Sequence, residues 1–468
     1  MVPPSHPHRL VAAYWRPKAI DAVARVRATT AGRAVGWSER VDDIGRPSVN
    51  GLGFEAPEDL TTGGRATSTE FRSRSGRRVG AMRVARYDLA DPAFPVSLVE
   101  VDRPALPRPD WARVRIDRAG ICGSDLHLVY PSAPGSEVLG DFASFPMEMG
   151  HEMMGTVVEV GADCPLAVGT RVAVDPGIAC AARGLEPCAR CTIGAWSTCL
   201  RFTSRAVTHG FGHGFTQGLG AGWADELVAH PSQLHVVPDE VDDDEAAMTE
   251  PLSISVHGVL RSPPPDGAPV LVVGAGMIGL TAVAALRRLF PASEVTVLAR
   301  HAHQAAAATA LGAHHVVRPD DGDDGWLGEL ARLGGGFVTG RRSGAMLNGG
   351  YPLVIEAVGT GAAVTQAAKL CGQGGSVVLI GATGPSEVNL APVWAKELSL
   401  VGTFCHAVDR VGDEAPVHSF DRALGLLAAG ALPAAVAVTH RFPLAELRDA
   451  CRTANDRAAG ALKVQLVP

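Results

Sequence analysis

The first group of residues that could do chemistry is Cys122, His151, Glu152 and Glu250. One thiolate, one imidazole and a carboxylate suit a catalytic zinc site, which needs about three protein ligands and one open position. These residues are spread over more than a hundred positions, so spacing alone does not define a site. Taken singly, each has an ordinary interpretation as a buried cysteine, a core histidine or a surface glutamate.

A second group is a tight cluster of cysteines: Cys180, Cys188, Cys191 and Cys199. Four thiolates are the usual ligands of a closed, tetrahedral structural zinc site. The alternative is a set of unligated thiols, which so dense a cluster makes the weaker interpretation. The sequence therefore predicts a second metal centre that is separate from the first.

A glycine-rich string points to a dinucleotide. It reads Gly274-Ala275-Gly276-Met277-Ile278-Gly279 and matches G-x-G-x-x-G between an apolar strand and a helix. The first glycine permits the tight turn, the second admits the pyrophosphate, and the third lets helix and strand pack closely. Phosphate would then bind the helix N-terminus. Glycines at such a turn can be purely structural, but their place inside a βαβ unit favours cofactor binding.

The end of the next strand bears on the choice of cofactor. A NAD site places Asp or Glu about 20 residues after the last motif glycine, to bind the ribose 2′-hydroxyl. Here Ala299 stands there, followed by Arg300 and His301. Without a carboxylate nothing repels a 2′-phosphate, and a guanidinium can bind it through two hydrogen bonds. The sequence favours NADP over NAD, although Arg300 could also be a solvated strand-end residue.

These groups need a scaffold, and the second half of the chain predicts one. Apolar strands alternate with helical patterns, which is typical of a parallel, doubly wound sheet with helices on both faces. The predicted strands are 269–273, 294–298, 353–357, 376–380 and 398–401, and the predicted helices are 277–290, 302–311 and 362–370. Between them, residues 315–351 contain many glycines and are expected to form one long, mobile loop.

The first half has different sequence features. From Met82 to about Glu250 short β runs are separated by Gly, Pro and Asp, which indicates a twisted, barrel-like β domain. After about residue 420 we expect one helix and a final strand, 463–467, that could return to this domain. His209 and His213, in a glycine-rich stretch, are weaker candidates for the lining of a substrate cleft.

Composition and charge limit the possible functions. The 468 residues, with 46% hydrophobic side chains, 54 Gly and 33 Pro, indicate more than one globular domain. A net charge of −7 gives no general attraction for nucleic acid or an anionic membrane. Residues 1–81 are Arg-rich and net positive, and we expect a disordered extension there. No apolar signal or membrane-spanning stretch is present, which favours a cytoplasmic protein.

The motifs together resemble those of a known family. Ala119–His127, Gly150–Glu152, Glu250-Pro251-Leu252 and the glycine turn occur in the order and at the separations found in zinc-dependent medium-chain dehydrogenases. Alcohol, sorbitol, threonine and glucose dehydrogenases belong to that family. The resemblance covers essentially all of residues 82–468.

The resemblance implies a fold and a domain plan. The fold would be α/β, with a GroES-like, β-rich catalytic domain and a Rossmann domain that carries the parallel sheet. The catalytic domain would span residues 82–256 and be completed by residues 405–468, and the Rossmann domain would span residues 257–404. The active site would lie in the cleft between the two.

The resemblance also implies roles for the candidate residues. Cys122 and His151, with either Glu152 or Glu250, would hold the catalytic zinc. Asp125 would orient the His151 imidazole. Ser124 matches the hydroxyl that accepts the substrate proton, and His127 matches the residue that passes this proton to solvent.

The cysteine cluster is similar to the structural-zinc lobe of the same family, with one departure. The usual first cysteine, three residues before Cys188, is Leu185 in this chain. Cys180 lies eight residues before Cys188 and could reach the site, because a longer loop adds little closure entropy. The fourth ligand of the predicted structural zinc is therefore either Cys180 or absent.

The sequence thus predicts a zinc-dependent dehydrogenase that interconverts an alcohol or polyol with its ketone or aldehyde and uses NADP in preference to NAD. One alternative is a zinc-independent reductase of activated double bonds from the same superfamily. A remote alternative is a protein that uses the cysteines as a zinc ribbon. We expect a small-molecule substrate, no nucleic-acid or membrane partner and, by the resemblance, a homodimer or homotetramer.

Overall fold

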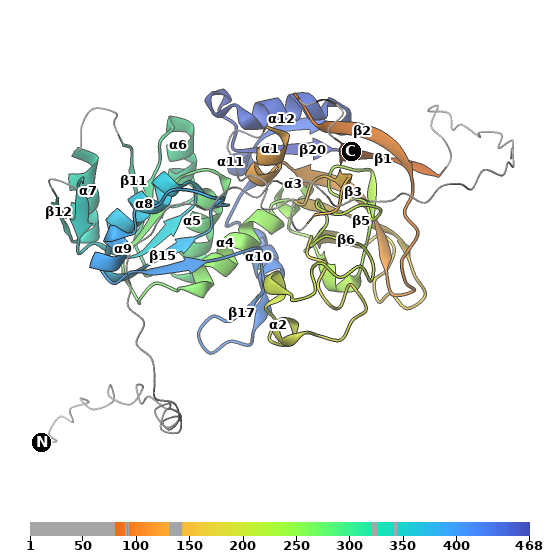
Figure 1. Cartoon of the computed structure of the whole chain (residues 1–468), viewed down its shortest axis with the longest axis horizontal. Coiled ribbons are helices and arrows are strands. Elements are labelled where there is room, and N and C mark those ends of the chain that lie inside the picture. The colour runs from red at the N-terminus through yellow and green to blue at the C-terminus, as the bar shows by residue number, and fades with distance from the viewer. Residues whose placement is uncertain (1–79, 89–90, 92, 131–142, 320–324, 341–343) are drawn as a thin grey trace, which may run out of the picture. The chain divides into compact units, whose positions relative to one another are not determined.

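The structure is a computed structural model of the chain, shown in Figure 1. It describes residues 80–468, except 89–90, 92, 131–142, 320–324 and 341–343. Apart from its last two residues, the extension expected over 1–81 lies outside the described residues. The first described strand is β1 (Ala81–Tyr87), and its second residue, Met82, is buried.

Mostly antiparallel strands form the part of the structure that carries the first donor group. A seven-stranded sheet has the order β19-β20-β3-β5-β6-β8, with β7 paired to β3, and a smaller sheet has the order β2-β1-β4. The strands are β2 (Val96–Asp102), β3 (Ala112–Gly120), β4 (Met147–Glu148), β5 (Met153–Val160), β6 (Arg171–Val174), β7 (Glu226–Ala229), β8 (Leu234–Val236), β19 (Val438–Pro443) and β20 (Lys463–Val467). The fully buried Trp111 and Trp223 fill its core.

Short helical turns connect these strands. They are α1 (Gly123–Val129), α2 (Ala189–Thr192), α3 (Asp243–Ala246) and the 3-10 turns Trp196–Thr198 and Pro231–Gln233. Asp242 starts α3 because its side chain accepts a hydrogen bond from the Glu245 backbone N–H, which satisfies one of the free donors of a helix N-terminus.

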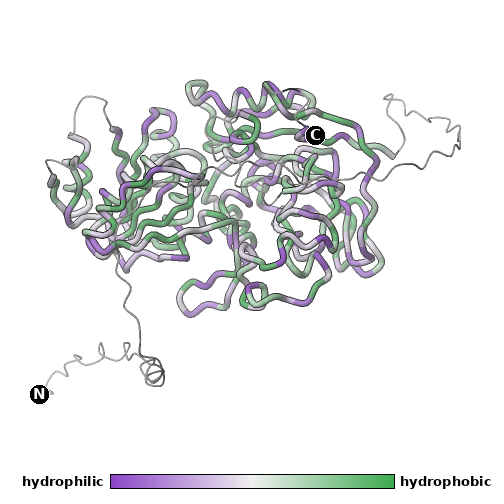
Figure 2. The backbone as a smooth tube through the Cα atoms, viewed as in Figure 1, coloured by the Kyte–Doolittle hydropathy of each residue, from purple (hydrophilic) through white to green (hydrophobic). Residues whose placement is uncertain are grey.

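Parallel strands form a separate six-stranded sheet with the order β11-β10-β9-β14-β15-β16. Its strands are β9 (Val270–Val273), β10 (Val295–Leu298), β11 (His315–Val317), β14 (Tyr351–Glu356), β15 (Cys371–Leu379) and β16 (Ser399–Gly402). Every residue of β9 and β10 is buried, because a parallel sheet is covered on both faces. Figure 2 shows hydrophobic residues gathered along these central strands.

Helices follow the parallel strands as the alternating pattern predicts. They are α4 (Thr249–Arg261), α5 (Met277–Leu289), α6 (Ala302–Ala310), α8 (Gly361–Leu370) and α9 (Ala391–Ala395). The strand order reverses at β9, because β10 and β11 extend the sheet on one side and β14 to β16 extend it on the other. Ligands of such sheets bind at this switch point, beyond the carboxyl ends of the strands.

The prediction of one long loop over residues 315–351 is wrong. Its described residues contain β11, the helix α7 (Gly325–Gly334), and an antiparallel hairpin of β12 (Phe337–Thr339) and β13 (Met346–Asn348). The helix buries Leu327, Leu330 and Ala331 at helical spacing against the parallel sheet. The many glycines suggested one continuous loop, but they lie at the ends of these short elements. The apolar spacing of the helix was therefore overlooked.

The chain end returns to the antiparallel sheet. After β16 come a hairpin of β17 (Val408–Asp409) and β18 (Val417–His418), then α10 (Ser419–Ala428), α11 (Ala434–Ala437) and α12 (Leu447–Asn455). The last strand, β20, pairs antiparallel with β3 and parallel with β19. We expected one helix in this tail, and the structure has three.

Candidate active site and metal centres

The first donor group comes together around the start of α1. Cys122 is the N-cap of α1, and its backbone N–H donates to the Asp125 carboxylate at 3.0 Å. His151 and Glu152 directly precede β5, which pairs with the strand that ends just before Cys122. Ligand atoms of Cys122, His151 and Glu152 all lie within 4.8 Å of one another. The pairing of β3 with β5 therefore brings together residues that are distant in the sequence.

Asp125 sets the orientation of the His151 ring. An Asp125 carboxylate oxygen lies 3.2 Å from Nδ1 of His151, and Asp125 is fully buried. The other ring nitrogen, Nε2, is then the atom that can bind a metal ion, and the Ser124 hydroxyl lies 3.5 Å from it. Burial disfavours a charged imidazole, but the Asp125 carboxylate outweighs it and raises the pKa of His151. A carboxylate behind a histidine is the usual support of a metal-ligating imidazole.

The two candidate glutamates have different environments. Both carboxylate oxygens of Glu152 accept hydrogen bonds from the buried Lys463 ammonium, at 2.7 and 2.5 Å. Glu250, on α4, has a buried Oε2 with no hydrogen-bond partner, and burial raises its pKa to about 8. Its ligand atoms do not belong to the set that lies within 4.8 Å. Glu152 thus has a cationic partner. Glu250 has an oxygen without a hydrogen-bond partner, and it lies close enough to Glu152 and His151 for their charges to affect its pKa.

The donors fit a zinc ion. A thiolate, a supported imidazole and an adjacent carboxylate match the ligand types of catalytic zinc. Gly120, at the end of β3, makes room for them, because a Cβ there would lie 1.9 Å from an oxygen of Glu152. His127 lies in the last turn of α1 and is exposed.

The four clustered cysteines also converge. Ligand atoms of Cys180, Cys188, Cys191 and Cys199 lie within 4.8 Å of one another, and the sulfurs of Cys180 and Cys199 are 3.6 Å apart. Burial raises the pKa of the Cys188 thiol, but backbone N–H groups outweigh it and lower the pKa to about 6. Leu185 packs against the cluster without supplying a donor. The structure therefore brings Cys180, eight residues before Cys188, to the place where a fourth ligand is needed.

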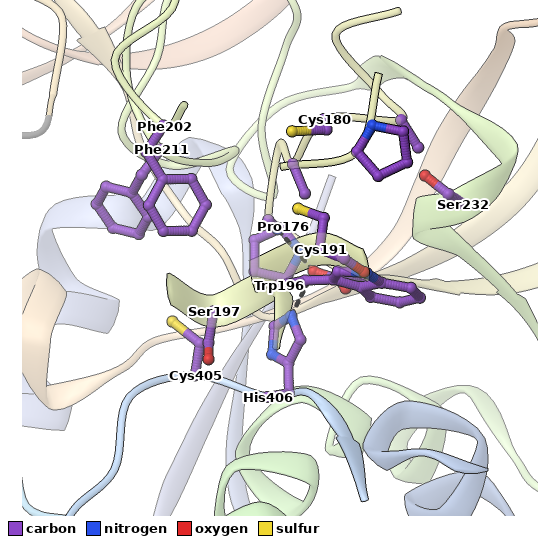
Figure 3. A pocket seen from close by; sticks show the side chains of 15 residues that line it. Pro176, Cys180, Cys191, Trp196, Ser197, Phe202, Phe211, Ser232, Cys405 and His406 are labelled. Atoms are coloured by element: carbon purple, nitrogen blue, oxygen red, sulfur yellow. Dashed lines mark hydrogen bonds and ion pairs between the residues drawn. The ribbon is translucent and has the colours of Figure 1, made fainter. Parts of the chain in front are cut away.

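A cavity of about 220 Å³ adjoins the cysteine cluster. Figure 3 shows Cys180 and Cys191 at its upper side, with Cys405 and His406 at its lower side. Phe211 forms part of the wall and stacks on Phe215, whose ring lies 5.4 Å from that of His151. A row of aromatic rings thus links this cavity to the first donor group.

The glycine turn lies at the carboxyl end of β9, at the switch point of the parallel sheet. Gly274 has a φ of +97°, which L side chains rarely adopt. Gly276 is the N-cap of α5, so Met277 and Ile278 form the first helical residues. A Cβ on Gly279 would lie 2.0 Å from the carbonyl oxygen of Gly274. Gly274 and Gly279 thus have the steric roles that the motif requires, and a Cβ on Gly276 would meet no protein atom within 4 Å.

The residues after β10 surround a second helix N-terminus. Ala299 is fully buried, Arg300 is exposed, and His301 is the N-cap of α6. The His301 ring stacks on that of His303, with 5.6 Å between centroids. No carboxylate occupies the strand end at Ala299.

Sequence reasoning missed several neighbours of these sites. Lys463 donates hydrogen bonds to Glu152, the Phe215 ring packs on that of His151, and the His303 ring stacks on that of His301. Only Lys463 left a signal, because a lysine stands in a strand whose other residues are mostly apolar. His213, a candidate for the cleft, is fully buried and its Nδ1 lies 3.0 Å from the Gly220 carbonyl oxygen.

Comparison with known proteins places these features in a family. A sequence model described as "Alcohol dehydrogenase GroES-like domain" matches residues 108–239, and one described as "Zinc-binding dehydrogenase" matches residues 278–429. L-galactonate-5-dehydrogenase of Escherichia coli K12 is 30% identical over 74% of this chain and 88% of its own length. L-idonate 5-dehydrogenase of Vitis vinifera is 29% identical over 75% of this chain and 86% of its own length.

Solved structures agree with these sequence matches. A protein described as a zinc-binding dehydrogenase, from Sinorhizobium meliloti 1021 and bound to NADP, has a TM-score of 0.64 and 28% identity. The match covers 83% of this chain and 99% of the other. The predicted fold class, a GroES-like domain with a Rossmann domain, is thereby confirmed. Within the described residues, no helix has the length and apolar character that crossing a membrane requires.

Proposed function

The chain belongs to the zinc-dependent medium-chain dehydrogenases, and on this premise we propose that it uses zinc and NADP to oxidise a polyol or secondary alcohol to its ketone. The coarser function, an oxidoreductase of the alcohol and polyol type, follows from relatives that act on L-idonate and L-galactonate. The convergence of Cys122, His151 and Glu152 within 4.8 Å carries the proposal that zinc takes part.

The ligand assignment follows from the donors. Cys122 and His151 would hold the ion, and Glu152 or Glu250 would be the third ligand. Lys463 holds the Glu152 carboxylate through two hydrogen bonds and supplies a compensating positive charge inside a buried region. Glu250 has an unpartnered buried oxygen that a nearby cation would satisfy.

The proton of the alcohol would leave through the residues of α1. When bound, zinc supplies a Lewis acid that lowers the pKa of the alcohol, and the nicotinamide accepts the hydride. Ser124, whose hydroxyl lies 3.5 Å from Nε2 of His151, would accept the alcohol proton. His127 is exposed and would release this proton to solvent. One alcohol and one NADP⁺ thus give one ketone, one NADPH and one proton.

The preference for NADP rests on the end of β10. Ala299 offers no carboxylate to repel a 2′-phosphate, and the exposed Arg300 follows it. One structural neighbour was solved with NADP and another with NADH, so the proposed preference rests on Ala299 and Arg300 alone.

A substrate screen tests the proposal. Purified protein is incubated with polyols, sugar acids and simple alcohols, each with NADP⁺ or NAD⁺, while the absorbance of the reduced nicotinamide is followed. We expect turnover with a polyol or sugar acid, with a higher kcat/KM for NADP⁺, and loss of this turnover after chelation while NADPH still binds. Turnover that survives complete metal removal, or reduction only of activated double bonds, would favour the zinc-independent reductase instead.

A further inference from the structure

A third group of metal-binding side chains lies apart from the two centres described above. Asp175, His235 and His418 each place a ligand atom within 4.8 Å of the others. All three are nine-tenths or more buried. They come from the residue after β6, from the middle of β8, and from the N-cap of α10, so the fold gathers them from distant parts of the chain.

Hydrogen bonds orient the Asp175 carboxylate. Its Oδ1 lies 2.5 Å from Nε2 of the buried His406 and accepts the Gly177 backbone N–H at 2.6 Å. The other oxygen, Oδ2, faces Nε2 of His418 at 3.5 Å. One oxygen is therefore engaged by outer partners, and the second is directed toward the two histidines.

His235 has the protonation pattern of a metal ligand. Its Nδ1 lies 2.6 Å from the carboxylate of Asp421, which fixes the proton on Nδ1. Its Nε2 then carries a lone pair, and this atom is buried without a hydrogen-bond partner. Buried polar atoms without a partner are uncommon, and a bound ion or water molecule is a usual explanation.

His418 differs in its proton. Its Nδ1 accepts the Phe420 backbone N–H at 3.1 Å, so the neutral ring carries its proton on Nε2, the atom that faces Oδ2 of Asp175 at 3.5 Å. A metal ion that binds Nε2 therefore requires the other neutral tautomer, with the proton on Nδ1, and the hydrogen bond from Phe420 is then lost.

We propose that Asp175, His235 and His418 form a third zinc site, in which they supply three ligands and a water molecule supplies the fourth. Two imidazoles and a carboxylate are ligands that zinc accepts, and carboxylates that support metal-binding residues from outside, here Asp421 behind His235, are a regular part of such sites. The ion would tie β6 and β8 to the start of α10. The site also borders the cysteine lobe, because the ring of Trp196 lies 4.8 Å from that of His418.

Zinc content tests the proposal on the full chain. The double variant His235→Asn with His418→Asn removes both imidazoles, while Asn at position 418 remains a good N-cap for α10. After purification with zinc and gel filtration, elemental analysis is expected to give one zinc fewer per chain than in the unchanged protein. The matched control His315→Asn, on a partly exposed histidine, is expected to lose none. Equal zinc content in the folded double variant would overturn the proposal.

Two further measurements keep the test decisive. If the double variant does not fold, crystals of the unchanged protein grown with zinc are measured at the zinc absorption edge. An anomalous peak among Asp175, His235 and His418 supports the site, whereas a peak at the cysteine cluster with none here means that only a water molecule fills it. Cys122→Ser reports separately on the proposed catalytic zinc, so failure of that proposal is distinguishable from failure of this one.

Discussion

The two cysteine-containing centres balance buried charge in different ways. At the candidate catalytic centre the cation is Lys463, which binds both oxygens of Glu152 directly. At the cysteine lobe the buried cation is Arg183, whose guanidinium donates only to backbone carbonyls. Its acceptors are the carbonyl oxygens of Ile178, Phe202, Ser204, Thr208 and Gly210.

This difference is the one expected between a catalytic site and a structural site. Lys463 acts on a candidate ligand, so it can influence which of two carboxylates reaches the ion. Arg183 holds the backbone around the four cysteines. Their four thiolates would fill the coordination shell of a zinc ion, so no position would be open for a substrate, as a catalytic zinc requires. We therefore expect changes at the first centre to affect turnover and changes at the second to affect stability.

The largest effect is expected for Cys122→Ser. Loss of the thiolate weakens the hold on the ion that activates the alcohol, and several kcal/mol of transition-state stabilisation correspond to a loss of roughly 10³-fold in kcat. Steady-state kinetics measures this loss, and NADPH binding by fluorescence is expected to be unchanged. As a control, Cys164→Ser alters a cysteine outside both clusters and is expected to leave kcat intact. Comparable loss in both variants would remove the distinction between the centres.

The second largest effect is expected for Arg183→Met. This change leaves several buried carbonyl oxygens without a donor, and each such group costs about 1–3 kcal/mol. Denaturant unfolding should show a stability loss of about 3 kcal/mol or more, with kcat of the remaining folded protein within roughly threefold of the original. The control is Arg201→Met in the same lobe, whose exposed guanidinium donates to one carbonyl oxygen. A fall in kcat without a fall in stability would contradict the structural role of Arg183.

Local sequence patterns predicted the elements that hold these centres, because each element is marked by residues that are close together in the sequence. The glycine turn and the strands β9 and β10 are continuous in sequence, and their apolar runs mark them directly. The Cys180 cluster was equally visible, since four donors lie within twenty residues. The helix α7 was missed because glycines surround it and its apolar face is short.

Partners that are far apart in sequence could not be predicted. Glu152 and Lys463 are 311 residues apart, and the pairing of both β20 and β5 with β3 brings them together. Asp175, His235 and His418 follow no spacing rule either, because sheet pairing and the return of the tail create the group. The carbonyl acceptors of Arg183 are backbone atoms, which every residue carries, so the residue types in the sequence do not predict them.

A smaller effect on turnover is expected for Lys463→Met. The change leaves the Glu152 carboxylate buried without its cation and removes the two hydrogen bonds that hold this candidate ligand in place. Partners that support metal ligands contribute about 10–100-fold to activity, and we expect kcat/KM to fall within that range. Lys463→Arg keeps the charge and is expected to retain more activity than Met does. Equal activity in both variants would show that the buried charge does not matter to the reaction.

The smallest net effect is expected when the fourth cysteine is moved along the chain. Cys180→Ala alone removes one of four thiolates, so it should lose the lobe's zinc and lower the thermal midpoint. Adding Leu185→Cys restores a thiol three residues before Cys188, and Leu185 already packs against the cluster. The double variant should regain the zinc and come within about 1 kcal/mol of the original stability, because the donor set is restored and only the packing of Leu185 is lost. Elemental analysis with differential scanning calorimetry measures both. If the double variant binds no zinc, the longer loop from Cys180 is required for the geometry of the lobe, and the two cysteine positions are not interchangeable.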